Sequence, residues 1–110
     1  MNTTTITRAD LDATNTYTAS RDLIVTGHVE IAADLGIVRV RGSLLATGRI
    51  RALAGSGIEA GEGIEAGSGI KAGWGIEAGS GIEAGSGIEA GEGIEAGSGI
   101  EAGSGIEAGE

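Results

Sequence analysis

From residue 55 onward one six-residue unit, Ile-Glu-Ala-Gly-X-Gly, repeats with almost no variation. Side chains of a β-strand alternate between two sides, so a period of six keeps every Ile and Ala on one side and every Glu on the other. The same period does not close on the 3.6-residue turn of an α-helix, where the apolar residue would drift around the axis. The repeat therefore predicts short β-strands that begin at nine equally spaced isoleucines: Ile58, Ile64, Ile70, Ile76, Ile82, Ile88, Ile94, Ile100 and Ile106.

Gly-X-Gly separates these strands, and it predicts corners because glycine accepts backbone angles that other residues resist. Three strands and three corners make one triangular coil of about 18 residues, the usual arrangement of hexapeptide β-helices. Stacked coils lie about 4.8 Å apart, with Ile on Ile inside and Glu on Glu outside. We therefore expect an all-β fold, a single-stranded triangular parallel β-helix or solenoid, whose handedness the sequence leaves open.

The pattern divides the chain into three parts. Residues 1–27 are rich in threonine and only weakly periodic, as expected of an N-terminal cap on a solenoid. Residues 28–54 are expected to form irregular β-helix coils, and residues 55–110 the acidic hexapeptide-repeat β-helix. The step from Ile50 to Ile58 is longer than one hexad, which predicts a junction between two coil types or a bulge.

Two family resemblances accompany this pattern. In VRVRGSLLATGRIRA (38–52), apolar residues recur at Val38, Leu44 and Ile50 with glycines at the corners. This stretch resembles the bactofilins, polymer-forming bacterial proteins whose fold is a right-handed β-helix. The pure hexads are similar to the left-handed hexapeptide-repeat signature, with Ile at the aliphatic position and Ser near the corner. Both resemblances imply a β-helix, with opposite handedness.

The net charge of −9 lies entirely on the repeats. Residues 1–54 hold six Arg against five Asp or Glu, whereas residues 55–110 hold eleven Glu against one Lys. A coil of about 18 residues stacks glutamates in columns, and repulsion between like charges should raise their pKa values. An acidic face favours a basic partner, and it disfavours direct binding to nucleic acid or to an anionic membrane. The expected columns are Glu59, Glu77 and Glu95; Glu65, Glu83 and Glu101; and Lys71, Glu89 and Glu107.

Enzymatic catalysis and dedicated metal sites are disfavoured. Acid–base pairs of carboxylates need unlike environments, whereas identical repeats provide nearly identical ones. His28 is the only histidine, no cysteine is present, and nothing around His28 specifies an acyltransferase. Calcium-binding β-rolls use Asp in the turns of a nine-residue repeat, so weak cation condensation is the most that these mid-strand glutamates suggest. The charged repeats also lack the threonine array of an ice-binding face. We expect a non-enzymatic protein without cofactor or metal.

Two function classes fit a rigid acidic rod. In size and charge the chain is similar to acidic DNA-mimic inhibitors of phages, of anti-CRISPR or anti-restriction type. That resemblance implies a partner in the host defence machinery, a complex whose basic groove normally holds nucleic acid. The alternative is a self-assembling structural scaffold of bactofilin type, in which the glutamates serve only solubility. In the first class the partner-binding residues are Glu59, Glu65, Glu77, Glu83, Glu95, Glu101 and Trp74.

Trp74 replaces Ser or Glu at a corner position. It is either an interface anchor, because exposed Trp is enriched among binding hot spots, or a chance substitution at a tolerant site. The last coil has a neighbour on one side only, which predicts a homodimer or end-to-end assembly. Met1 to Thr7 is polar and no apolar signal-peptide region follows, so a cytoplasmic location in a bacterial host is expected. No apolar run is long enough to span a membrane.

Overall fold

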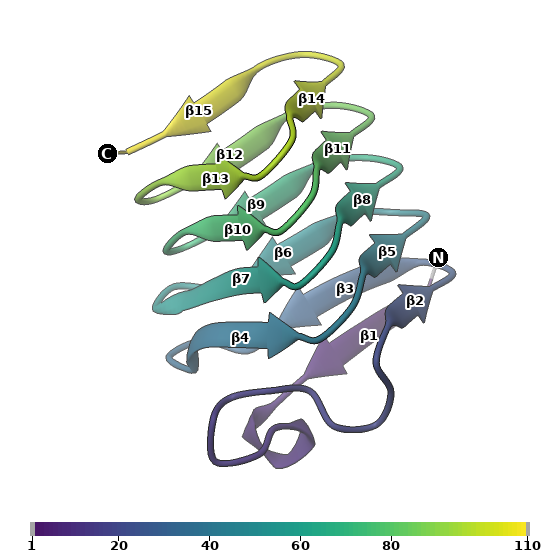
Figure 1. Cartoon of the computed structure of the whole chain (residues 1–110), viewed down its shortest axis with the longest axis vertical. Coiled ribbons are helices and arrows are strands. Elements are labelled where there is room, and N and C mark those ends of the chain that lie inside the picture. The colour runs from purple at the N-terminus through teal and green to yellow at the C-terminus, as the bar shows by residue number, and fades with distance from the viewer. Residues whose placement is uncertain (1, 110) are drawn as a thin grey trace.

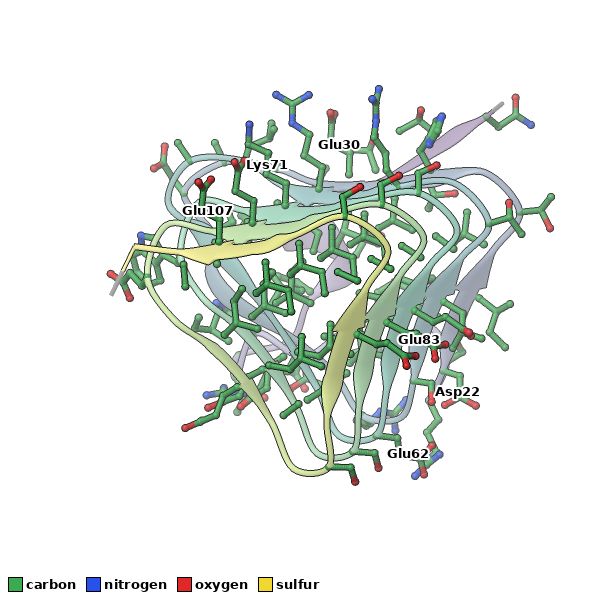
Figure 2. The ribbon with its side chains drawn as sticks, turned by 90° about the horizontal axis from the view of Figure 1, so that it is seen from above. Asp22, Glu30, Glu62, Lys71, Glu83 and Glu107 are labelled. Atoms are coloured by element: carbon green, nitrogen blue, oxygen red, sulfur yellow. The ribbon has the colours of Figure 1, made fainter. Side chains whose placement is uncertain are left out.

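Residues 2–109 of the chain, described by a computed structural model, wind into a parallel β-solenoid with three sides (Figure 1). Fifteen short strands and one 3₁₀ turn make up the regular structure of this part of the chain. Seen along the solenoid axis, the coils superimpose as a triangle (Figure 2). The predicted all-β, triangular, parallel β-helix is therefore confirmed.

Each side of the triangle is one parallel sheet, and we name each face by its number of strands. The six-stranded face consists of β1 (Thr3–Ile6), β3 (His28–Ile31), β6 (Ile50–Ala52), β9 (Ile70–Ala72), β12 (Ile88–Ala90) and β15 (Ile106–Ala108). The four-stranded face consists of β4 (Gly36–Val40), β7 (Ser56–Ala60), β10 (Ile76–Ala78) and β13 (Ile94–Ala96). The five-stranded face consists of β2 (Leu23–Val25), β5 (Leu44–Ala46), β8 (Ile64–Ala66), β11 (Ile82–Ala84) and β14 (Ile100–Ala102).

The strand register gives the length of each coil. Ile76 pairs with Ile58 on one side and with Ile94 on the other, so one coil of the repeat half consists of three hexads, as predicted. Upstream the coils are longer than three hexads, because Val38 pairs with Ile58 and Leu23 pairs with Leu44. The regular repeat thus continues an irregular solenoid without changing its three faces.

The interior is a stack of apolar side chains. From β8 to β12 each three-residue strand buries its Ile and its Ala and exposes the residue between them, because the pleat alternates sides. Ile58 and Ile88 are each 1 % exposed, and so are the isoleucines between them. Burial weakens in the last coil, where the Ile106 side chain is 49 % exposed. The apolar core therefore runs along the solenoid axis, and the burial of its side chains decreases over the last coil.

The irregular step between Ile50 and Ile58 is a wide corner, and the strand that follows it pairs without a bulge. All five residues of β4 pair in register with all five of β7, so the extra residues lie in the corner itself. Ser56 is fully buried there. Its hydroxyl donates to the Ala32 carbonyl over 2.5 Å and accepts from the Leu35 amide over 3.0 Å, which ties two successive wide corners together.

The predicted N-terminal cap lies at one end of the solenoid, where β1 and β2 form the first strands of two faces. Between them run the 3₁₀ turn η1 (Arg8–Asp10) and a loop in which Thr16 forms a parallel bridge to Arg39, at the outer edge of β4. Leu11 and Tyr17 in this segment are partly buried against the core. This segment is therefore an irregular first coil that covers the end of the apolar stack. Met1 and Glu110, the outer limits of the predicted parts, lie outside the described residues.

Candidate interaction surface: the glutamate columns

In every repeat strand except β9 (Ile70–Ala72), which has Lys71, a glutamate occupies the outward position between Ile and Ala, and these side chains stack directly on one another. Glu77 pairs in register with Glu59 and Glu95, and Glu83 pairs with Glu65 and Glu101. On the third side Glu89 pairs with Lys71 and Glu107. The three columns expected from the sequence are therefore present, one on each face. Figure 2 shows that Lys71 and Glu107 point outward from one side of the triangle and Glu83 from another.

In the irregular coils each column continues with side chains of a different kind. On the four-stranded face Arg39 stands next to Glu59, and on the six-stranded face Arg51 stands next to Lys71. On the five-stranded face the continuation is apolar, because Leu45 stands next to Glu65 and Ile24 next to Leu45. The three faces are nearly identical within the repeats and distinct beyond them.

The column of the four-stranded face is partly neutralised. The Arg39 Nε atom lies 2.6 Å from the Glu59 Oε1 atom, and the same guanidinium donates to the Thr14 carbonyl in the N-terminal segment. Hydrogen bonds with Glu95 and Glu59, with smaller contributions from burial and like charge, raise the pKa of Glu77 to about 7. The raised pKa expected for stacked carboxylates is thus confirmed at this residue. Near neutral pH the Glu77 carboxyl therefore carries less than a full negative charge.

The column of the six-stranded face is mixed in sign. The Lys71 Nζ atom lies 3.5 Å from the Glu89 Oε1 atom, an exposed ion pair. Arg49 and Arg51 join Lys71 along the shallow groove of this face. Acidic and basic side chains therefore offset one another here.

The column of the five-stranded face carries its charge without compensation. Glu65, Glu83 and Glu101 are exposed, and within residues 2–109 no basic side chain lies within 4.0 Å of their carboxylates. A shallow groove runs beside the column and is lined by Ser43, Leu45 and the glycines that precede each strand. This face presents the least compensated acidic surface of the described chain.

The corner between the four- and five-stranded faces, which we call the Glu62 corner, comprises residues 61–63, 79–81 and 97–99. Glu62 protrudes there, as Figure 2 shows. Its Oε2 atom lies 2.8 Å from the Arg21 Nη2 atom, and this ion pair lowers the pKa of Glu62. Arg21 and Arg39 thereby fasten the N-terminal coil to the first repeats. Sequence reasoning missed both contacts, because partners so far apart along the chain leave no local signal.

The predicted partner-binding residues are divided between two faces. Glu59, Glu77 and Glu95 lie on the four-stranded face, and the other three, Glu65, Glu83 and Glu101, lie on the five-stranded face across the Glu62 corner. Trp74 lies at the opposite edge of the four-stranded face, at its corner with the six-stranded face.

The Trp74 side chain is 41 % exposed. Its Cζ3 atom lies 4.0 Å from the position that a Cβ atom on Gly36 would take, so the ring leans along the corner toward the irregular coils. Trp74 is therefore grouped with one glutamate column and separated from the other.

The described residues contain no group of three or more His, Cys, Asp or Glu side chains that could hold a metal ion. His28 is partly buried at the start of β3, where its Nδ1 atom accepts a hydrogen bond from the Arg49 amide over 3.0 Å. In the structure the imidazole thus accepts a backbone hydrogen bond from the corner that precedes β6. No helix in residues 2–109 is long and apolar enough to cross a membrane.

Comparison with known proteins found no match to this chain among protein-family models, curated proteins or solved structures.

Proposed function

We propose that this protein is a DNA mimic, a non-enzymatic acidic rod that fills the basic groove of a nucleic-acid-binding complex and excludes the nucleic acid. Inhibitors of anti-CRISPR or anti-restriction type act in this way. The partner is a basic complex of the defence machinery in the cytoplasm of a bacterial host. Neither nucleic acid nor a membrane is the ligand, since both would be repelled by the surface.

The observation that carries the proposal is the linear density of charge along the solenoid. Residues 58–109 hold ten Glu and one Lys, a formal net charge of −9, and they form three coils. With a rise of about 4.8 Å per coil, this is about one negative charge per 1.6 Å. Double-stranded DNA carries about one per 1.7 Å of helix axis. A groove that neutralises DNA phosphates therefore meets a similar field on this rod.

The arrangement of the charge supports the same function. Two columns, on the four- and five-stranded faces, flank the Glu62 corner and form two parallel acidic rows along one ridge. A partner that grips this ridge contacts all six predicted glutamates at once. Trp74 lies outside the ridge, so it acts as an anchor only for a partner that also extends across the four-stranded face.

The test is displacement of a labelled DNA duplex from candidate complexes, measured by fluorescence anisotropy. The panel contains a restriction enzyme and RNA-guided nuclease complexes. We expect the protein to displace DNA from at least one of them, with strong dependence on salt. A variant with all six glutamates changed to glutamine should lose this activity. The control changes three exposed serines of the remaining corner to glutamine: Ser68, Ser86 and Ser104.

Failure of every complex in the panel to release DNA, or full activity of the six-glutamine variant, would contradict the proposal. In a complex that does respond, the W74A variant decides the role of Trp74. Weaker displacement by W74A identifies an anchor, and unchanged displacement identifies a tolerated corner substitution.

One observation favours the alternative function, a self-assembling scaffold of bactofilin type. Among the described residues β13, β14 and β15 each pair on one side only, and Ile106 is half exposed. Unpaired strand edges favour pairing with another copy. Electron microscopy distinguishes the two functions, because filaments are expected of the scaffold and discrete particles of the DNA mimic.

A further inference from the structure

We propose that the five-stranded face is the surface on which the partner docks, and that it accepts a protein segment carrying a row of arginine or lysine side chains next to an apolar side chain. This inference rests on the proposed function and identifies which side of the acidic ridge makes the principal contact, namely the five-stranded face rather than the four-stranded face. It also adds an apolar requirement that DNA mimicry alone does not include.

The shape of this face is the first argument. Its groove runs along three glycines, Gly63, Gly81 and Gly99, each of which precedes a strand. None of the three has a positive φ. A Cβ atom on Gly63 or Gly81 would lie 3.5 or 3.4 Å from its nearest neighbour, and one on Gly99 would meet nothing within 4 Å. The fold therefore tolerates side chains at these positions, and their absence leaves an open trough beside the glutamates.

The apolar end of the face is the second argument. The Ile24 side chain is 70 % exposed, and its register partner Leu45 is partly exposed and lines the groove. Both stand in the column that continues into Glu65. Removing such exposed apolar side chains from water lowers the free energy of the complex with a partner. A partner that matches the whole column is therefore basic along most of its length and apolar at one end.

The charge of the face selects the partner. On the other two faces Glu59 is paired with Arg39 and Glu89 with Lys71, so part of each column is already compensated. The carboxylates of Glu65, Glu83 and Glu101 have no such ion pair in the described chain. A basic segment displaces only water and free ions from this face, whereas on the others it must also compete with bound cationic side chains.

The experiment uses a fluorescent peptide of seven arginines followed by two leucines, titrated with the whole protein at low salt. The E83Q/E101Q variant removes two charges from the five-stranded face. Its matched control, E89Q/E107Q, removes two charges from the same two coils on the six-stranded face. We expect E83Q/E101Q to bind the peptide about fivefold more weakly and the control to change binding less than twofold.

Two further comparisons test the shape of the trough and the apolar contact. G81T fills the trough and should weaken peptide binding, whereas G87T at the equivalent place on the six-stranded face should not. I24S should weaken binding of the leucine-containing peptide but not of a nine-arginine peptide. Circular dichroism melts establish that each variant is folded.

Equal losses of peptide binding in E83Q/E101Q and in E89Q/E107Q, or no binding of the peptide to the wild-type protein at all, would overturn the assignment. It would also be overturned if the wild type sedimented as a dimer and E83Q/E101Q as a monomer, because a second copy would then cover this face. These outcomes are separable from failure of the proposed function. If the protein displaces duplex DNA but E83Q/E101Q and E89Q/E107Q lose peptide binding equally, only the assignment to the five-stranded face is rejected. If the peptide binds at the five-stranded face but no duplex is displaced, only DNA mimicry is rejected.

Discussion

At the scale of single residues, the two glycines of each Gly-X-Gly corner have different roles. From Gly61 to Gly109, a Cβ atom on the first glycine would lie 2.0–2.7 Å from a backbone oxygen of the preceding coil. Real atoms do not approach so closely, so the backbone of the corner would have to shift. The second glycine has more space, because from Gly63 to Gly87 its Cβ atom would lie 3.2–3.5 Å from a backbone oxygen of the next coil. The stacking of the coils therefore requires the first glycine of each corner much more strictly than the second.

This difference predicts unequal losses of stability for the same substitution at the two glycines of one corner, Gly79 and Gly81. G79A places a methyl group against the Gly61 carbonyl and should lower the free energy of unfolding by about 2 kcal/mol or more. G81A meets its nearest atom at 3.4 Å and should change it by less than about 1 kcal/mol, because alanine also restricts the unfolded chain. Urea unfolding followed by circular dichroism measures both, and similar losses would contradict the assignment.

At the scale of the element, the wide corner depends on one buried hydroxyl. Ser56 makes two hydrogen bonds across successive coils, to Ala32 and from Leu35. In S56A the buried Leu35 amide and the partly buried Ala32 carbonyl lose their partner, so we expect a loss of about 1–3 kcal/mol in the free energy of unfolding. S80A, at an exposed corner of a regular coil, is the control and should be neutral. Equal melting temperatures of the two variants would show that the hydroxyl is dispensable.

The column of the four-stranded face predicts a pH dependence. Glu77 has a folded-state pKa of about 7, above its ordinary value of 4.5. Between these two values the folded state binds more protons than the unfolded state, so the free energy of unfolding falls as the pH rises from 4.5 through 7. The exposed carboxylates are screened by solvent, so we expect a decrease in melting temperature of only about 2 °C.

Two other carboxylates set the acidic limit. The pKa of Asp12 is lowered by hydrogen bonds from Thr14 and Thr16, and that of Glu62 by Arg21. Their stabilisation is lost as the pH falls below their unfolded values of 3.8 and 4.5. The melting temperature should therefore be highest near about pH 5. The E77Q variant should remove the decrease in melting temperature between about pH 5 and pH 7 and leave the decrease at lower pH unchanged. If the decrease toward neutral pH persists in E77Q, Glu77 is not its cause.

At the scale of the whole molecule, the net charge of −9 comes from the repeat half, in which eight of the eleven glutamates stand in three stacked columns. Salt screens like charges, so added sodium chloride at about pH 8 should raise the melting temperature. The variant with six glutamines should show little of this response. A wild-type protein that melts at lower temperature in salt would indicate that its ion pairs, such as Arg39–Glu59, outweigh the repulsion.

The sequence predicted the repeat half closely because a strict period of six fixes both the inward face and the register. Ile76 pairs with Ile58 and Glu77 with Glu59, as a coil of three hexads requires. The irregular half was less predictable. The size of its coils depends on the length of individual corners, and no period records that length. For that reason the contacts of Arg21 and Arg39 were not foreseen.

The candidate surface was likewise predictable only in part. The sequence located the glutamates and set the column of Lys71 apart, but the other two columns are built from identical hexads and could not be ranked. What distinguishes the faces is the residue that each column meets upstream: Arg39, Arg51 or Leu45. Those neighbours follow from the register of the irregular coils, which only the structure supplies.

Because each side of the triangle is one hexad, the gain or loss of hexads has a discrete outcome. Replication slippage that removes three hexads deletes one full coil and leaves every later residue on its original side. Slippage that removes a single hexad leaves a closed tube, but it rotates everything downstream by a third of a turn. Such a gene can thus rearrange its surface through copy number alone, without a single amino-acid substitution.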